Sequence, residues 1–178
     1  MMKSEGFMKT NTIRILLSCS FIGLAHTNNP IALESDTDQR VSWSSDGGST
    51  MNIVGESRIL EMNTNVIVTQ GSLEIRGAKA IFEYQASSNE LTKITVHGTP
   101  VQYKQQLDQN GAIVNGTSNT LLFYTNDKDE TVLELLENAS IESPDSTISC
   151  SAIIYIAEQD LIKEAVGPCA GALTSTSN

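Results

Sequence analysis

The chain has few aromatic residues, and its scarcity of histidine and cysteine argues against a metal-binding protein. Of its 178 residues, 5% are aromatic, two are histidine and three are cysteine. So few histidines and cysteines cannot assemble the usual sets of zinc ligands, and we expect no metal site. Neither a G-x-S-x-G nor an H-E-x-x-H motif occurs, and His97 fits a structural role beside a turn. We therefore expect neither an enzyme nor a bound cofactor.

Positive charge is also scarce. Eleven lysines and arginines stand against 21 acidic residues, which gives a formal net charge of −10. Binding to a phosphate backbone depends on clustered lysine and arginine, so nucleic acid is not an expected partner. The chain is 39% apolar and long enough for one domain with a proper core, which argues against intrinsic disorder.

A short apolar run near the N-terminus predicts export. Basic and polar residues precede Ile15–Ala25, an eleven-residue run that ends in small residues, as in a secretory signal peptide cut after Ala25. As a helix the run would cover about 16 Å, about half of a bilayer's hydrocarbon core, which disfavours a permanent anchor. Cys19 lies inside the run, whereas a lipidated cysteine should end it. Met8 is an alternative start, because it directly precedes the basic stretch.

Short segments of alternating polarity fill the rest of the chain. Leu73 and Ile75 alternate with charged residues, and so do Ile94 and Val96. Turn signals separate such segments every ten to eighteen residues, and no sustained helical stripe occurs. Residues 130–138 contain good helix formers but also alternate, so we predict a strand there, and residues 126–130 read as a turn rather than a calcium loop. The pattern predicts antiparallel strands joined by hairpins.

An internal repeat favours stacked hairpins. In four places a small residue stands five positions before a large apolar one: Gly55 and Leu60, Gly77 and Phe82, Gly116 and Leu121, Cys150 and Tyr155. Repeated hairpins bury their apolar faces by stacking on one another. Residues 40–50 break the pattern and are predicted to form a polar loop around Trp43.

Four stretches together carry a resemblance to a known family. In chain order they are PIALESD at 30–36, NVIVTQG at 65–71, GTPVQY at 98–103, and VNG at 114–116 leading into LLFY at 121–124. This ordered set behind a signal peptide resembles the lipopolysaccharide-transport periplasmic protein family, also called the LptA or OstA family. The resemblance covers about residues 30–166.

The resemblance implies an all-β fold, an incompletely closed antiparallel β-jelly roll whose two sheets form a V. It implies a periplasmic carrier whose apolar trough holds the lipid A part of lipopolysaccharide. Copies would join head to tail between an inner-membrane transporter complex and an outer-membrane translocon. By position, Thr27 and Ile31 would lie at the N-terminal edge, and Tyr103, Phe123 and Thr125 on the interior wall. We expect a signal peptide at 1–25, the β domain at 26–169 and a flexible tail at 170–178.

The candidate groove residues are large and apolar: Ile31, Phe82, Tyr84, Ile94, Val96, Tyr103, Leu121 and Phe123. Periodicity cannot separate a lined groove from a packed core. A structural β-sandwich without lipid therefore stays open, as does a membrane-anchored relative that retains residues 15–25 and docks on the transporter.

Charge differs along the chain. Residues 56–104 hold five acids and five bases, whereas residues 127–164 hold ten acids and two bases. Lipid A phosphates are anionic, so the part containing Arg58, Arg76, Lys79 and Lys93 should tolerate them better. A solvated surface that keeps the protein soluble explains the same charges without a ligand.

The first and last strands should form the open edges of the sheet. We predict assembly through Ile31 and Leu33 at one edge and through Leu161 and Val166 at the other.

Cys150 and Cys169 are a candidate disulfide in an oxidising compartment, although two separate buried thiols would also fit. Pairing Ile156 with Leu161 in the final hairpin places Cys150 opposite Gly167, and a bend at Gly167-Pro168 could bring Cys169 within reach. These two cysteines are not part of the family pattern.

Overall fold

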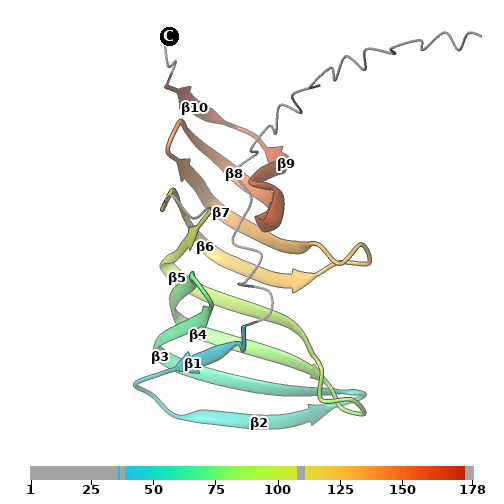
Figure 1. Ribbon diagram of the computed structural model, residues 1–178. Coiled ribbons are helices and arrows are strands. Elements are labelled where there is room, and N and C mark those ends of the chain that lie inside the picture. The colour runs from blue at the N-terminus through green and yellow to red at the C-terminus, as the bar shows by residue number, and fades with distance from the viewer. Residues whose placement is uncertain (1–35, 37–38, 108–110, 175–178) are drawn as a thin grey trace, which may run out of the picture.

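The computed structural model describes Asp36, residues 39–107 and residues 111–174 (Figure 1). The predicted signal peptide and Thr27, Ile31 and Leu33 lie outside the described residues. The described elements are β1 Ser42–Ser44, β2 Ser49–Val54, β3 Ser57–Gln70, β4 Leu73–Gln85, β5 Leu91–Gln106, β6 Ile113–Thr125, β7 Thr131–Ser143, β8 Ser146–Ile156, the 3-10 helix η1 Ala157–Gln159, β9 Leu161–Val166 and β10 Ala170–Leu173.

These strands form one antiparallel sheet in which β3 to β8 follow one another in chain order. Figure 1 shows them stacked along the molecule, from β2 at the bottom to β10 at the top. Both edges are divided: β1 and β2 pair with different parts of β3, and β9 and β10 with different parts of β8. The two edges do not pair with each other within the described chain, so the expected unclosed all-β fold is confirmed.

A line of irregularities crosses the sheet near the middle of the long strands, and we call it the crease. The pairing register shifts at Asn63/Val66 on β3, Arg76/Lys79 on β4, His97/Val101 on β5, Thr117/Thr120 on β6 and Leu136/Ala139 on β7. A bulge bends a strand, and on some strands it also reverses which side chains face inward. On β4, for example, Ile75 is buried before the crease and Phe82 after it.

Glycine permits the close strand approach at the crease. A Cβ on Gly77 would lie 2.4 Å from a Val96 methyl and 2.8 Å from the His97 carbonyl oxygen. Gly116 and Cys150, from the same sequence repeat, also lie beside register shifts, whereas Gly55 occupies the β2–β3 turn with φ +60°. The repeat therefore marks the bend of three hairpins and the turn of a fourth.

The sheet curls so that strands distant in its order meet. The rings of Tyr103 on β5 and Tyr155 on β8 are 6.3 Å apart, although β6 and β7 separate these strands. The rings of Trp43 on β1 and Phe82 on β4 are 6.4 Å apart in the same way. The two arms that meet at the crease therefore enclose one continuous apolar core.

Two sequence predictions are wrong. Residues 40–50 are not a loop, because they contain β1 and the start of β2, and residues 170–173 are not a flexible tail, because they form β10. Side chains of β1, β2 and β10 are exposed on both faces, so no alternation of polarity reveals these strands. The predicted strand at 130–138 is confirmed within β7.

Candidate functional site

Apolar side chains form continuous rows across the inner face, because residues paired between neighbouring strands share that face. The first row contains Met51, Leu60, Phe82, Ile94, Phe123, Leu133, Tyr155 and Ile162. The second contains Met62, Ala80, Val96, Leu121, Leu135 and Ile153. The third contains Trp43, Val68, Ile75, Tyr103, Gly116, Ile141 and Ile148. The rows run perpendicular to the strands, along the long axis of the sheet.

The structure brings the sequence-predicted groove residues together in these rows. Phe82, Ile94 and Phe123 are consecutive in the first row, while Val96 and Leu121 are neighbours in the second. All five and Tyr103 are buried. Tyr84 is only half-buried, at the outer part of β4, and Thr125 is exposed at the end of β6, where it lines the same opening as Phe123.

The candidate groove residues cover less than half of each row. Met62, Ile141 and Ile153 are buried but stand in stretches where the crease interrupts the alternation. Residues 152–157 on β8 and η1 form an unbroken apolar run, in which period two cannot be read at all. The alternation around Leu133 and Leu135 was the one further sequence pattern that could have identified row residues.

Exposed apolar groups lie at both edges of the sheet, and Ile162, the last member of the first row, is half-buried. At the N-terminal edge, Met51 is 59% exposed and Ile53 is 70% exposed. At the C-terminal edge, a cavity of about 370 Å³ opens among Ile148, Ile162 and Leu173, and Leu173 is 85% exposed. Apolar surface is therefore exposed to solvent at both ends of the sheet.

A lateral opening of about 330 Å³ also reaches the interior. Val41, Leu91 and Phe123 supply its apolar lining, and Lys93 and Asp129 lie at its polar rim. Phe123 belongs to the first row, so this opening leads directly to that row of apolar side chains.

Comparison with known proteins identifies the family. Residues 50–160 match the family described as "LptA/(LptD N-terminal domain) LPS transport protein". The chain belongs to this family.

Individual relatives agree with that assignment. The lipopolysaccharide export system protein LptA of Haemophilus influenzae is 31% identical over 77% of this chain and 76% of its own length. The Escherichia coli K12 protein of the same name is 29% identical over 85% of this chain and 78% of its own. The crystal structure of LptH, the LptA homologous periplasmic component from Pseudomonas aeruginosa, matches with a TM-score of 0.64 and 16% identity over 79% of this chain and 99% of that one. The last likeness shows the fold. Membership places the chain among transport proteins rather than enzymes.

A series of hydrogen bonds between buried polar side chains lies beside the third row in this LptA-family member. The Tyr103 hydroxyl donates to Gln105 Oε1 at 2.6 Å, and Gln105 Nε2 donates to Asp36 Oδ2 at 3.3 Å. The backbone N–H of Ser72 donates to Asp36 Oδ1 at 2.9 Å. Burial, helped by the acidic groups Asp160, Asp36 and Glu158, raises the pKa of Tyr103 well above its usual value. No sequence pattern pointed to these polar partners.

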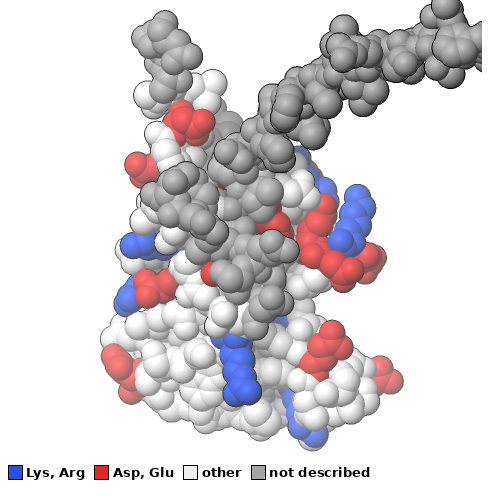
Figure 2. Space-filling view, in the orientation of Figure 1, with Lys and Arg blue, Asp and Glu red and all other residues white. Residues whose placement is uncertain are grey.

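The basic residues that we expected to tolerate phosphate are largely engaged. Nitrogen–oxygen distances of 2.7 Å join Arg76 to Glu74, Lys79 to Glu61 and Lys93 to Glu83. Arg58 donates to the side chain of Asn89. Figure 2 accordingly shows blue and red side chains interspersed rather than a continuous basic patch on this face.

The described residues contain no cluster of three or more His, Cys, Asp or Glu side chains able to hold a metal ion. The side chain of Asn126 accepts hydrogen bonds from the backbone N–H groups of Lys128 and Glu130, at 2.9 and 3.1 Å, so this segment is the predicted turn. Within the part of the chain that the structure describes, no helix is long and apolar enough to cross a membrane.

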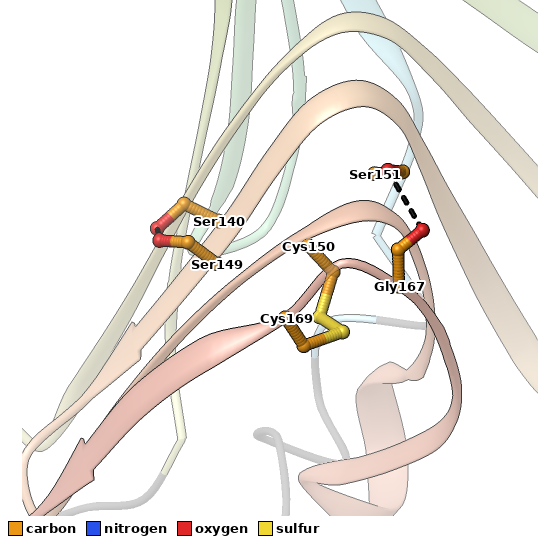
Figure 3. The surroundings of a disulfide bond; sticks show 6 residues. All are labelled: Ser140, Ser149, Cys150, Ser151, Gly167 and Cys169. Carbon is orange, nitrogen blue, oxygen red and sulfur yellow. Dashed lines mark hydrogen bonds between the residues drawn. A yellow bond between two sulfur atoms is a disulfide. The ribbon is translucent and has the colours of Figure 1, made fainter.

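Cys150 and Cys169 are joined by a disulfide in the structure (Figure 3). The predicted pairing of Ile156 with Leu161 is confirmed, but Cys169 does not reach Cys150 diagonally across that hairpin. The chain bends at Gly167 and Pro168, and β10 then pairs Ala170 with Ser149, which places the cysteines directly opposite each other. The bridge thus lies where β9 gives way to β10.

Proposed function

We propose that this chain carries lipopolysaccharide through the periplasm, with the acyl chains of lipid A lying along the apolar rows. The observation that carries the proposal is the first row, which runs from Met51 at one edge to Ile162 at the other and contains the Tyr155 hydroxyl as its one polar group. An ordinary sandwich core would be covered at its ends, whereas this row begins at exposed Met51 and ends at Ile162, which lines an open cavity together with exposed Leu173. Membership of the LptA family supports the same substrate.

Lipid would enter by separating the two arms of the sheet. The arms meet through the ring contacts of Tyr103 with Tyr155 and of Trp43 with Phe82. The lateral opening at Phe123 gives an acyl chain a first apolar contact beside those rings. The buried residues at the crease would then contact lipid in place of one another, so little apolar surface would be exposed during transfer.

Head-to-tail assembly would align the rows of successive copies. The strands alternate in direction across the sheet, so β9 of one copy and β2 of the next would run antiparallel, as an added strand requires. Leu161 and Val166 lie on β9 and are 46% and 47% exposed. At the opposite edge, we propose that Ile31 and Leu33 also take part in assembly. The same two edges would receive the inner-membrane transporter complex and the outer-membrane translocon.

Export to the periplasm is part of the proposal. A disulfide between Cys150 and Cys169 suits an oxidising compartment. Sequencing the N-terminus of the protein from a periplasmic extract tests it. A terminus at residue 26 supports a free carrier, whereas retention of residues 15–25 would favour the membrane-anchored relative.

Photo-crosslinking tests lipid binding. A photoreactive phenylalanine analogue at Phe123 lines the lateral opening, and the same analogue at Leu122, whose side chain points to the other face of β6, serves as the matched control. We expect a light-dependent lipopolysaccharide adduct at 123 and much less at 122. Equal labelling at both positions, or none at 123, would favour a β-sandwich that holds no lipid.

A further inference from the structure

The C-terminal edge of the sheet is built from two strands that meet at a break. β9 pairs with residues 152–156 of β8, and β10 pairs with residues 146–149. The break falls at Gly167 and Pro168, beside the crease. Without β10, this part of β8 would itself be the open edge.

β10 has little of its own to hold it in place. It is four residues long, and every one of its side chains is exposed. Short exposed strands near a chain end open easily, because they bury few apolar groups. The disulfide anchors the residue immediately before β10 to a side chain on β8 that is only 6% exposed. The bridge is therefore placed to keep β10 on the edge.

The N-terminal edge has a matching division. β1 and β2 contain three and six residues, and β10 and β9 contain four and six. β1 and β10 lie on the same side of the crease, because the third row connects Trp43 on β1 with Ile148, which pairs with β10. β1 and β10 also run in opposite directions. If a second copy stacks on the C-terminal edge, its β1 lies next to β10 and its β2 next to β9, so each edge strand meets a strand of similar length.

We infer that the Cys150–Cys169 disulfide holds β10 as the second half of a docking edge for another copy of this chain, with β10 receiving β1 while β9 receives β2. This inference rests on the head-to-tail assembly of the proposed function and adds to it the covalent determinant and the second strand pair. Exposed Trp43 and Leu173 would be covered at the junction.

The backbone of β10 shows which donor faces the incoming strand. The N–H of Thr174 donates to the Asp145 carbonyl oxygen at 2.8 Å, so it points toward β8. Donors alternate in direction along a strand, and the N–H of Leu173 therefore points to the open edge. Leu173→Pro removes that one outward donor without breaking the pairing with β8, and Leu173→Ala is the control for the side chain.

Sedimentation of the exported chain over a concentration series measures the effect. Relative to Leu173→Ala, we expect Leu173→Pro to weaken self-association about tenfold. Cys150→Ala combined with Cys169→Ala should weaken it by at least as much, and a reductant should reproduce this loss in the wild type. In the cysteine-free background, Leu173→Pro should have no further effect, because β10 is no longer held on the edge.

The outcomes separate the inference from the proposed function. Equal weakening by Leu173→Pro in both backgrounds, or unchanged association after loss of the disulfide, overturns the inference. Lipopolysaccharide crosslinking at Phe123 would still stand in either case. A wild-type chain that stays monomeric throughout overturns the inference together with head-to-tail assembly, and an absence of crosslinking at Phe123 counts against the carrier itself.

Discussion

The two edges of the sheet are both broken at the crease, but different interactions close the breaks. At the N-terminal edge, the backbone N–H groups of Asp46 and Gly47 donate to the Thr64 and Asn63 carbonyl oxygens at 2.9 and 3.1 Å. Asn65 Nδ2 also donates to Asp46 Oδ2 at 2.8 Å. At the C-terminal edge, Ser151 Oγ donates to the Gly167 carbonyl oxygen at 3.0 Å, and the disulfide lies beside it (Figure 3).

The difference follows from where each edge lies in the chain. β1 is continued by β2, which forms a tight hairpin with β3, so chain connectivity itself limits how far β1 can move. β10 is the last described strand and has a hairpin partner on neither side. A covalent link to β8 compensates for this, because it removes conformations that a free end would explore.

The largest expected effect is the loss of the covalent link. Cys150→Ala with Cys169→Ala opens a loop with a sequence separation of 19 residues. The chain-entropy treatment of such loops predicts a loss of about 3 kcal/mol in the free energy of unfolding. Urea denaturation measures this loss. A reductant should lower the free energy of unfolding of the wild type but not that of the variant. Two alkylated thiols in the unreduced periplasmic protein would show that the bridge is absent.

The next largest expected effect is a loss of stability at alkaline pH, which depends on tyrosines near the two edges. Burial raises the pKa of Tyr84, near the N-terminal edge. Burial, the neighbouring Tyr103 and a hydrogen bond to Asp160 raise the pKa of Tyr155, beside the C-terminal edge. A phenol with a raised pKa keeps its proton in the folded chain, while the unfolded chain releases it near pH 10. Stability should therefore fall above pH 10, by about 1.4 kcal/mol per pH unit for each fully protected phenol.

Absorbance at 295 nm during alkaline titration follows this ionisation. Tyr84 should ionise before the main transition, and Tyr103 and Tyr155 only as the chain unfolds. Tyr84→Phe should remove the early phase alone. Full reversible ionisation of every tyrosine in the folded state would contradict the buried positions.

A smaller loss is expected from the ring that crosses the N-terminal edge. Trp43 is 47% exposed and contacts Phe82. Trp43→Ala should lower the free energy of unfolding by about 2 kcal/mol, about half the usual cost for a fully buried aromatic side chain. Trp43→Phe should recover most of it. A loss of stability as large as that of the cysteine double variant would show that β1 depends on the Trp43–Phe82 contact as strongly as β10 depends on the disulfide.

The smallest effect concerns the hydrogen bond that closes the N-terminal break. Asp46→Ala removes the acceptor of the exposed bond from Asn65. We expect a loss of about 0.5–1 kcal/mol in thermal or urea unfolding, because water replaces the partner. Asp46→Asn keeps an acceptor oxygen and should be close to wild type. A loss of several kcal/mol would mean that the two edges are held equally firmly.

Local pattern predicted the strands that have one buried face. Leu73, Ile75, Ile94 and Val96 alternate with polar residues, and each side chain lies inward as expected. The final hairpin register was also predictable, since the turn at residues 158–160 brings Ile156 opposite Leu161. Strand existence and hairpin order depend on neighbours in sequence, which a sequence displays directly.

The candidate site was predicted less completely, for a physical reason. The inward face changes parity at the crease on β4, β5, β6 and β8 but not on β3 or β7. Alternation read on one side of the crease therefore does not predict the other side, and residues such as Ile141 and Ile153 were missed. The edges were misread at β1 and β10, where exposure on both faces leaves no pattern.

The sequence by itself determined the all-β class, the hairpin order and the family. Only the tertiary structure decided that paired residues line up into rows from edge to edge, and that Cys169 meets Cys150 through β10 rather than across the last hairpin. Rows and edge pairings depend on contacts between residues far apart in sequence. Such contacts form only when the whole sheet has bent at its crease, so no local pattern can encode them.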